Sequence, residues 1–189
     1  QMAVFTNNDD GWQTAVDLQA AGVDVTAVID SRDVDAPMSV PGAKHLRGQG
    51  IVNTIGRKGV KAIETSGGVT LPVDAVAVSG GWSPNVHLTC HQRGRPVWND
   101  ALSAFVPGGS MPVGMSVAGA ANGVFSTHGA LTSGADAAKA VLSDLGMTAK
   151  APPLPTAEDA PVNLTPFWHV KTAKRARVDQ QNDVTSKDL

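Results

Sequence analysis

The sequence predicts an α/β fold with a parallel sheet, and its first 30 residues carry the main reason. An apolar segment (residues 3–6) is followed by a helix-like segment (11–21) and a second apolar segment (23–29) that ends on Asp30. A strand, a helix and a strand in this order form a parallel pair with the helix packed on one face. A further apolar segment, "VDAVAVSGG" (residues 73–81), reads as another buried strand.

The bulk properties exclude several classes of protein. The chain has 189 residues, a formal net charge of −2 and 17% charged residues, so no strong electrostatic attraction to nucleic acid or to a membrane surface is expected. No apolar run approaches the roughly 18 residues of a membrane span, and no signal peptide is visible at the start. The single cysteine, Cys90, excludes an internal disulfide framework and suits a reducing cytoplasm, which is the predicted location.

The first helix has clear end signals. Asn8, Asp9 or Asp10 can cap its start with a short side-chain oxygen, and Gly22 suits the left-handed residue that ends a helix. The turn before this helix reads "TNNDDG", where a nucleotide-binding βαβ unit would carry glycines. Asn7 to Asp10 would block the close approach of a pyrophosphate, and the two carboxylates would repel it, so we expect no nucleotide there.

The rest of the chain has less regular signals. Residues 31–50 are rich in turn formers and hold at most a short helix, whereas "GIVNTIG" and "GVKAIETS" (50–56 and 59–66) read as a hairpin. Residues 87–109 read as irregular. A strand is predicted over 113–118 and a helix over 127–145, and five prolines between residues 151 and 166 have linker composition. Both ends look cut, which predicts an internal fragment of a longer protein.

Three segments are candidates for chemistry. The strand end "VAVSGGWSPN" (76–85) could let a ligand approach the backbone, or it could be an ordinary turn. The segment 116–138, a small-residue turn before a helix, could offer free N–H groups to a cofactor or simply pack tightly. The third is a cluster that could hold an anion or an acidic partner surface, although a solvated loop is the favoured interpretation: His87, His91, Arg93 and Arg95.

Other chemistry finds little support. The five histidines have no metal-ligand spacing, so no metal site is predicted. Cys90 has no partner thiol, and Ser79 before Gly80 is not a nucleophile elbow.

Several unusual strings together resemble one family. "AVFTNNDDGW", "GGWSPNVHLTCHQRGRP", "VAGAANGVFST" and "DQQNDVTSKD" are similar, in this order and nearly end to end, to the α subunit of heterotetrameric sarcosine oxidase. The resemblance implies Rossmann-like dinucleotide-binding domains of the glutathione-reductase type, here incomplete. Residues 1–75 would be the second unit, with a degenerate nucleotide turn, and 76–149 the return segment of the first dinucleotide-binding domain. Residues 150–175 would be a proline-rich linker, and 176–189 the start of a small helical domain.

The resemblance also implies a reaction and its cofactors. The family demethylates sarcosine oxidatively to glycine, with formaldehyde or methylene-tetrahydrofolate and hydrogen peroxide as the other products. FAD lies in the β subunit, FMN at the α/β interface, NAD in the α subunit and tetrahydrofolate in a C-terminal domain beyond this chain, and the partners are the β, γ and δ subunits. No catalytic residue and no metal ligand is expected here. The residues expected to border NAD are Gly80, Gly81, Trp82, Gly119, Ala120, Ala121, Asn122, Phe125, Ser126 and Thr127.

Two alternatives stay open. The α subunits of opine or cyanide-forming flavin dehydrogenases share the architecture, and cysteine pairs for an iron–sulfur cluster after the linker would favour them. A non-catalytic scaffold with a purely structural dinucleotide is the other alternative. Because the returning strand and helix would miss the sheet that they complete, four valines are expected to be poorly covered by this chain alone: Val76, Val78, Val113 and Val117.

Overall fold

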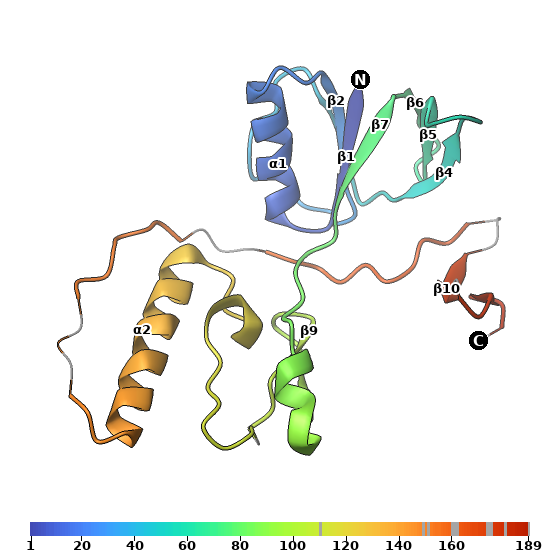
Figure 1. Ribbon diagram of the computed structural model, residues 1–189. Helices are drawn as coiled ribbons and strands as arrows, with labels where there is room; N and C mark the ends of the chain where they lie inside the picture. Colours follow the sequence, from blue (N-terminus) through green and yellow to red (C-terminus); the bar gives the residue numbers. More distant parts are fainter. Residues whose placement is uncertain are drawn as a thin grey trace. The chain divides into compact units, whose positions relative to one another are not determined.

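The computed structural model describes residues 1–109, 111–148, 150, 152–159, 163–172, 176–179 and 181–188 (Figure 1). The chain divides into two compact units. Unit 1 consists of Gln1–Gly80 and Thr165–Leu189, and unit 2 consists of Gly81–Leu164.

Unit 1 is built on a parallel sheet with the strand order β3-β2-β1-β7. The strands are β1 (Met2–Thr6), β2 (Val25–Asp30), β3 (Lys44–Arg47) and β7 (Ala75–Ser79), and every neighbouring pair is parallel. Helix α1 (Asp9–Ala20) connects β1 to β2, as the sequence predicts, and Gly22 follows it with a left-handed φ of 85°. The prediction of an α/β fold with a parallel sheet is therefore confirmed.

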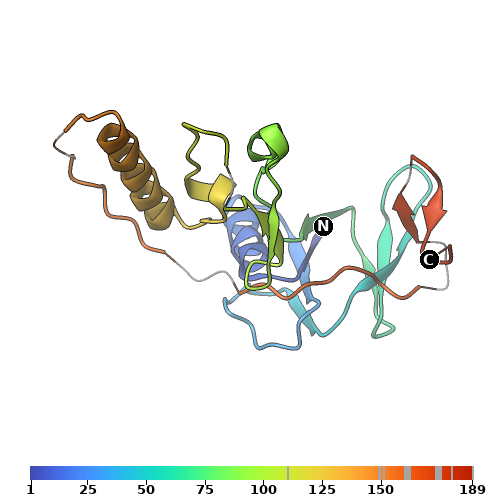
Figure 2. The ribbon, with the colours of Figure 1, turned by 90° about the horizontal axis from the view of Figure 1, so that it is seen from below.

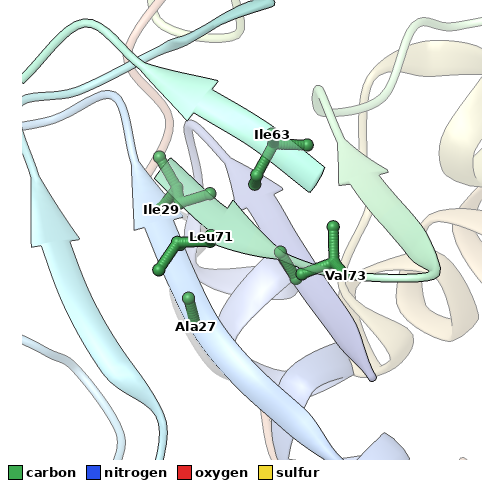
Figure 3. Close-up of a cluster of buried hydrophobic side chains, with 6 residues drawn as sticks. Ala27, Ile29, Ile63, Leu71 and Val73 are labelled. Carbon is green, nitrogen blue, oxygen red and sulfur yellow. The ribbon is translucent and has the colours of Figure 1, made fainter. Parts of the chain in front are cut away.

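Each face of this sheet has its own core. On the α1 side, the buried residues include Val4, Trp12 and Val28. The other side packs against a three-stranded antiparallel sheet made of β4 (Ile51–Ile55), β5 (Ala62–Thr65) and β6 (Thr70–Pro72). Figure 3 shows this second core, in which Ala27 and Ile29 of β2 face the labelled side chains Ile63, Leu71 and Val73. Two covered faces explain why β2 is apolar through most of its length.

The β4–β5 pair is the predicted hairpin, and its antiparallel register pairs Thr54 with Ile63. The turn-rich segment 31–50 holds a strand that the sequence did not predict. This is β3, whose "KHLR" has no apolar alternation because it lies at the edge of the sheet with three exposed residues. Near the C-terminus, β10 (Arg177–Asp179) and β11 (Val184–Thr185) form a short antiparallel ladder, the red arrows in Figure 2. The assignment of residues 176–189 to a following helical domain stays a prediction.

Unit 2 contains the predicted second helix, α2 (Thr127–Asp144), and the 3₁₀ helices η1 (His87–Arg93) and η2 (Gly119–Asn122). A hairpin of β8 (Val97–Asn99) and β9 (Ala104–Val106) lies in the stretch that the sequence left irregular. Its strands are only three residues long, too short for an alternation signal.

The predicted strand over residues 113–118 is wrong. The structure forms a turn there, with the Met115 amide donating to the Pro112 carbonyl at 3.0 Å and Gly114 at a left-handed φ of 77°. The ribbon has no arrow in this segment in either view (Figures 1 and 2). Val113 is fully exposed and Val78 is 68% exposed, which confirms that these two are poorly covered. Val76 and Val117 are half-buried, and Val76 packs against the second core of unit 1, so the expectation is not confirmed for these two.

Candidate functional site

The turn between β1 and α1 is held by its own side chains. The Oδ1 atom of Asn8 accepts from the Gly11 amide at 3.2 Å and caps the helix. The Thr6 hydroxyl accepts from the Asn8 amide at 3.1 Å and donates to the Asn8 carbonyl at 2.8 Å. A Cβ atom at residue 11 would collide with the Thr6 side chain. The single glycine of this turn therefore serves the packing of the turn itself.

A later segment of the chain lies against the same turn. The Thr165 amide donates to the Asn7 carbonyl at 3.0 Å, and the Asn7 Nδ2 atom donates to the Thr165 carbonyl at 2.9 Å. Two residues further along, Phe167 meets Phe5 edge-to-face, with ring centroids 5.8 Å apart. The stretch around residue 165 thus occupies the edge of the sheet at which a nucleotide would approach.

A buried charged cluster fills the carboxyl ends of β1 and β2. Asp30, which is 1% exposed, accepts from Trp12 Nε1 at 2.8 Å. The guanidinium of Arg32, which is 6% exposed, donates to Asp30 through Nη2 at 2.8 Å and through Nε at 3.0 Å. The same guanidinium reaches Asp9 in the first turn of α1, with Nη1 to Oδ1 at 2.8 Å. We call these four residues the Asp30 cluster.

The hydrogen bonds and the burial of this cluster shift the pKa values of Asp30, Arg32 and the neighbouring His45. Burial alone would raise the pKa of Asp30, but hydrogen bonds from Arg32 and Trp12 outweigh it and hold that pKa below its ordinary value. Burial likewise opposes the charge on Arg32, while Asp30 and Asp9 raise the pKa of the guanidinium. His45 meets the ring of Trp12 edge-on at 3.9 Å, and burial lowers the pKa of this imidazole.

The Asp30 cluster lies where a nucleotide-binding βαβ unit would hold the ribose and the phosphate of its ligand. In an open nucleotide unit, a carboxylate at the end of the second strand binds the ribose and the helix N-terminus binds the pyrophosphate. Here the carboxylate of Asp30 is bound by Trp12 and Arg32, and the first turn of α1 carries Asp9 and Asp10. Every buried side-chain nitrogen or oxygen of the described residues has a hydrogen-bond partner.

The three residues after β7 that were predicted to border NAD are Gly80 in unit 1 and Gly81 and Trp82 in unit 2. Gly80 ends unit 1, and no atom lies within 4 Å of the position a Cβ would take there. Gly81 begins unit 2 with a φ of 96°, and a Cβ atom there would collide with the Leu164 side chain. Trp82 is 63% exposed.

The remaining predicted residues lie together before α2. Gly119, Ala120, Ala121 and Asn122 form η2, and Phe125, Ser126 and Thr127 lead into the helix. Gly119 has a φ of 62°, and its amide donates to the Ser133 hydroxyl of α2 at 3.2 Å. Gly123 ends η2 with a left-handed φ of 80°. These bonds place the small-residue turn directly against the start of α2.

The N-terminus of α2 is bound to a residue that the sequence did not single out. The amides of His128 and Gly129 donate to the two carboxylate oxygens of Asp159, at 2.8 and 3.2 Å. A hydrogen bond from the Ser126 side chain is the main reason that the pKa of Asp159 lies below its ordinary value. Asp159 stands in the proline-rich stretch, thirty residues beyond Gly129, and no local pattern marks it.

The four residues of the basic cluster lie in η1 or just after it. His87 and His91 lie on η1, and the His87 Nδ1 atom is 2.6 Å from Oδ1 of Asn85. Arg93 ends the 3₁₀ helix with a φ of 70°.

Among the residues that the structure describes, no group of three metal-ligating side chains is present. In the same described part of the chain, no helix is both long and apolar enough to cross a bilayer.

The parallel sheet, with a helix on one face and an antiparallel sheet on the other, defines an α/β protein. No family model matches the chain. Over 99% of its length it is 38% identical to sarcosine oxidase subunit alpha of Rhizobium meliloti (strain 1021). Over its whole length it is 31% identical to the same subunit of Corynebacterium sp. (strain P-1) and 30% identical to that of strain U-96.

In the region that it spans, the chain is similar over nearly its whole length to sarcosine oxidase α subunits. It spans about a fifth of the length of these curated relatives, 20% of the first and 22% of the other two. The resemblance in the sequence motifs is therefore confirmed.

Proposed function

We propose that this chain is the part of a sarcosine oxidase α subunit that helps to form the NAD-binding region of that subunit. The observation that carries the proposal is the similarity over at least 99% of the chain to three proteins of that name. The enzyme would demethylate sarcosine oxidatively to glycine, with formaldehyde or methylene-tetrahydrofolate and hydrogen peroxide. Its other parts would be the β, γ and δ subunits, with FAD in β, FMN at the α/β interface and tetrahydrofolate in a further domain of α.

The residues before α2 fit a dinucleotide in their backbone chemistry. Gly119 and Gly123 both have positive φ, which allows a tight turn with little side-chain bulk. Gly119 to Asn122 and Phe125 to Thr127 would border the NAD, and Gly80 to Trp82 would contribute from the end of β7.

In this proposal the chain positions a cofactor and performs no proton transfer itself. The protein supplies binding, orientation and electrostatics to a cofactor, and the cofactor carries the redox chemistry. The residues of this chain orient it through backbone groups, and the reaction at sarcosine would take place at the flavins of the complex.

Unit 1, on this proposal, keeps the fold of a nucleotide-binding unit without binding a nucleotide. Three observations support this part. Asn8 bonds within the turn, residue 165 lies against the turn, and Arg32 joins Asp30 to Asp9 where ribose and phosphate would be. A ligand would have to displace buried ion pairs to enter.

The test is the NAD content of the purified full-length enzyme carrying Gly119→Val. The matched control is Gly22→Val in unit 1, because Gly22 also has a positive φ, of 85°, and open space around it. Both substitutions impose similar backbone strain, so they differ mainly in position. We expect NAD content to fall several-fold in the Gly119 variant and to stay near the parent value in the Gly22 variant. Full NAD content in Gly119→Val, or equal losses in both, would refute the proposed site.

A further inference from the structure

Helix α2 begins without the local cap that most helices have. Its N-cap residue is Ser126, whose side chain makes no capping hydrogen bond to the helix, and its first turn has no acidic residue. The amide of Ala130 is already within the helix, since it donates to the Ser126 carbonyl at 2.9 Å. The amides of His128 and Gly129 come before it and have no helical carbonyl to bind.

Asp159 satisfies both of these amides with one carboxylate. Oδ1 accepts from His128 at 2.8 Å and Oδ2 accepts from Gly129 at 3.2 Å. The Ser126 side chain, which does not cap the helix, helps to lower the pKa of this carboxyl. Two amides from one helix start thus converge on one anion, which also lies at the favourable end of the helix dipole.

Glycine at position 129 preserves this arrangement. A Cβ atom there would lie 2.6 Å from the Ser126 Oγ atom and 2.8 Å from a methyl group of Val124. A side chain at residue 129 would therefore displace the Ser126 hydroxyl at the start of the helix.

The segment that carries Asp159 needs few contacts to be ordered, because it is rich in proline. Residues 152–159 contain Pro152, Pro153 and Pro155, whose rings fix φ and reduce the backbone entropy that ordering costs. Few additional bonds are then needed to order the segment.

We propose that Asp159 is an internal anion that attaches the 152–159 segment to α2 and closes the start of this helix to external phosphate and carboxylate groups. This goes beyond the proposed function, because it concerns access to the helix start whether or not a dinucleotide binds in the region. A phosphate would compete with Asp159 for the same two amides and for Ser126.

The test is hydrogen exchange, measured by mass spectrometry on the full-length protein carrying Asp159→Ala. Asp159→Asn keeps the size of the side chain without the charge, and Glu158→Gln is the matched control at the neighbouring carboxylate. Inorganic phosphate is the probe, with sodium chloride at the same ionic strength as its control. Peptides from α1 serve as the internal reference for overall stability.

We expect exchange at His128 and Gly129 to quicken by about tenfold in Asp159→Ala, by less in Asp159→Asn and not at all in Glu158→Gln. Phosphate, but not chloride, should restore the protection in Asp159→Ala and leave the parent unchanged. The proposal is overturned if Asp159→Ala keeps parental exchange, or if phosphate fails to reverse the loss. It is also overturned if phosphate protects these amides equally in the parent.

Discussion

The two α-helices in the described part of the chain start in opposite ways. Helix α1 is capped by its own Asn8 and buries Trp12 and Ala15 against the parallel sheet. Helix α2 is capped by Asp159, thirty residues beyond its first turn, and none of its residues is buried. Local signals and a core thus stabilise α1, whereas a distant contact holds the start of α2.

The two units differ in the same way. Unit 1 has two hydrophobic clusters, one on each face of its sheet. In the described part of unit 2, few apolar side chains are buried, Pro84 and Ala104 among them, and Leu145 and Val113 are exposed. Burial of apolar area is the main favourable term in folding, so unit 1 should account for most of the stability of the chain.

The largest expected effect comes from Arg32→Ala, which leaves Asp30 charged, 1% exposed and without its main partner. Breaking a buried pair in this way costs about 3–5 kcal/mol of unfolding free energy. Urea unfolding followed by circular dichroism measures it. Arg47→Ala is the control, because the ion pairs of Arg47 with Asp33 and Asp35 are exposed and should contribute at most about 1 kcal/mol. Equal effects of the two substitutions would contradict the role of the Asp30 cluster.

Core truncations should separate the two units. Ile63→Ala removes a fully buried side chain from the core of unit 1 and should lower the unfolding free energy by about 2–5 kcal/mol. Leu145→Ala in unit 2 removes a side chain that is 66% exposed and should change it by about 0.5 kcal/mol or less. The same urea titrations measure both. A large loss in the Leu145 variant would show that unit 2 has a core of its own.

Acid should weaken unit 1 through Asp30. Because the folded pKa of this carboxyl lies below its ordinary value of 3.8, its contribution is fully present above that value. The contribution is lost as the pH falls below 3.8 and through the lowered folded pKa. The stability of the parent should therefore drop in this range, measured as the urea midpoint between pH 5 and pH 2. Asp30→Asn should be less stable at neutral pH and show a smaller drop, and an equal drop would remove Asp30 as a cause.

The smallest effects concern the helix caps themselves. Asn8→Ala removes the bond to the Gly11 amide and the bonds of this buried side chain to Ser79, and should cost at least about 1 kcal/mol. Ser126→Ala should cost less in urea unfolding, because the Ser126 side chain makes no capping bond to its own helix. The reverse order would mean that α2 is capped locally after all.

The sequence predicted unit 1 well because its signals are local. Asn8 and Gly22 mark the two ends of α1, and the apolar strands β2 and β7 are each long enough to show a pattern. The edge strand β3 was missed because "KHLR" has no buried face of its own. The strand predicted over residues 113–118 is wrong because Pro112 and Gly114 form a turn there. The valines of this segment favoured a strand, but two turn-forming residues next to them determine the structure.

The candidate site was predictable only where one segment carries it. The glycines at 119 and 123 can be read from the sequence because small residues precede a helix. Asp159 could not be found in this way, since its role depends on a contact across thirty residues. The role of Arg32 was likewise not predicted. Its guanidinium bonds both Asp30 and Asp9, and these residues come together only because β1 and β2 end side by side in the folded sheet.

On the proposed function, a dinucleotide binds beside the turn before α2 and not in unit 1. Photo-crosslinking of the full-length enzyme with an azido derivative of NAD, followed by peptide mapping, tests it most directly. We predict labelled peptides from residues 80–82 or 119–127 and none from residues 7–12 or 30–32. Labelling of the β1–α1 turn or of the Asp30 cluster, with residues 119–127 unlabelled, would contradict it.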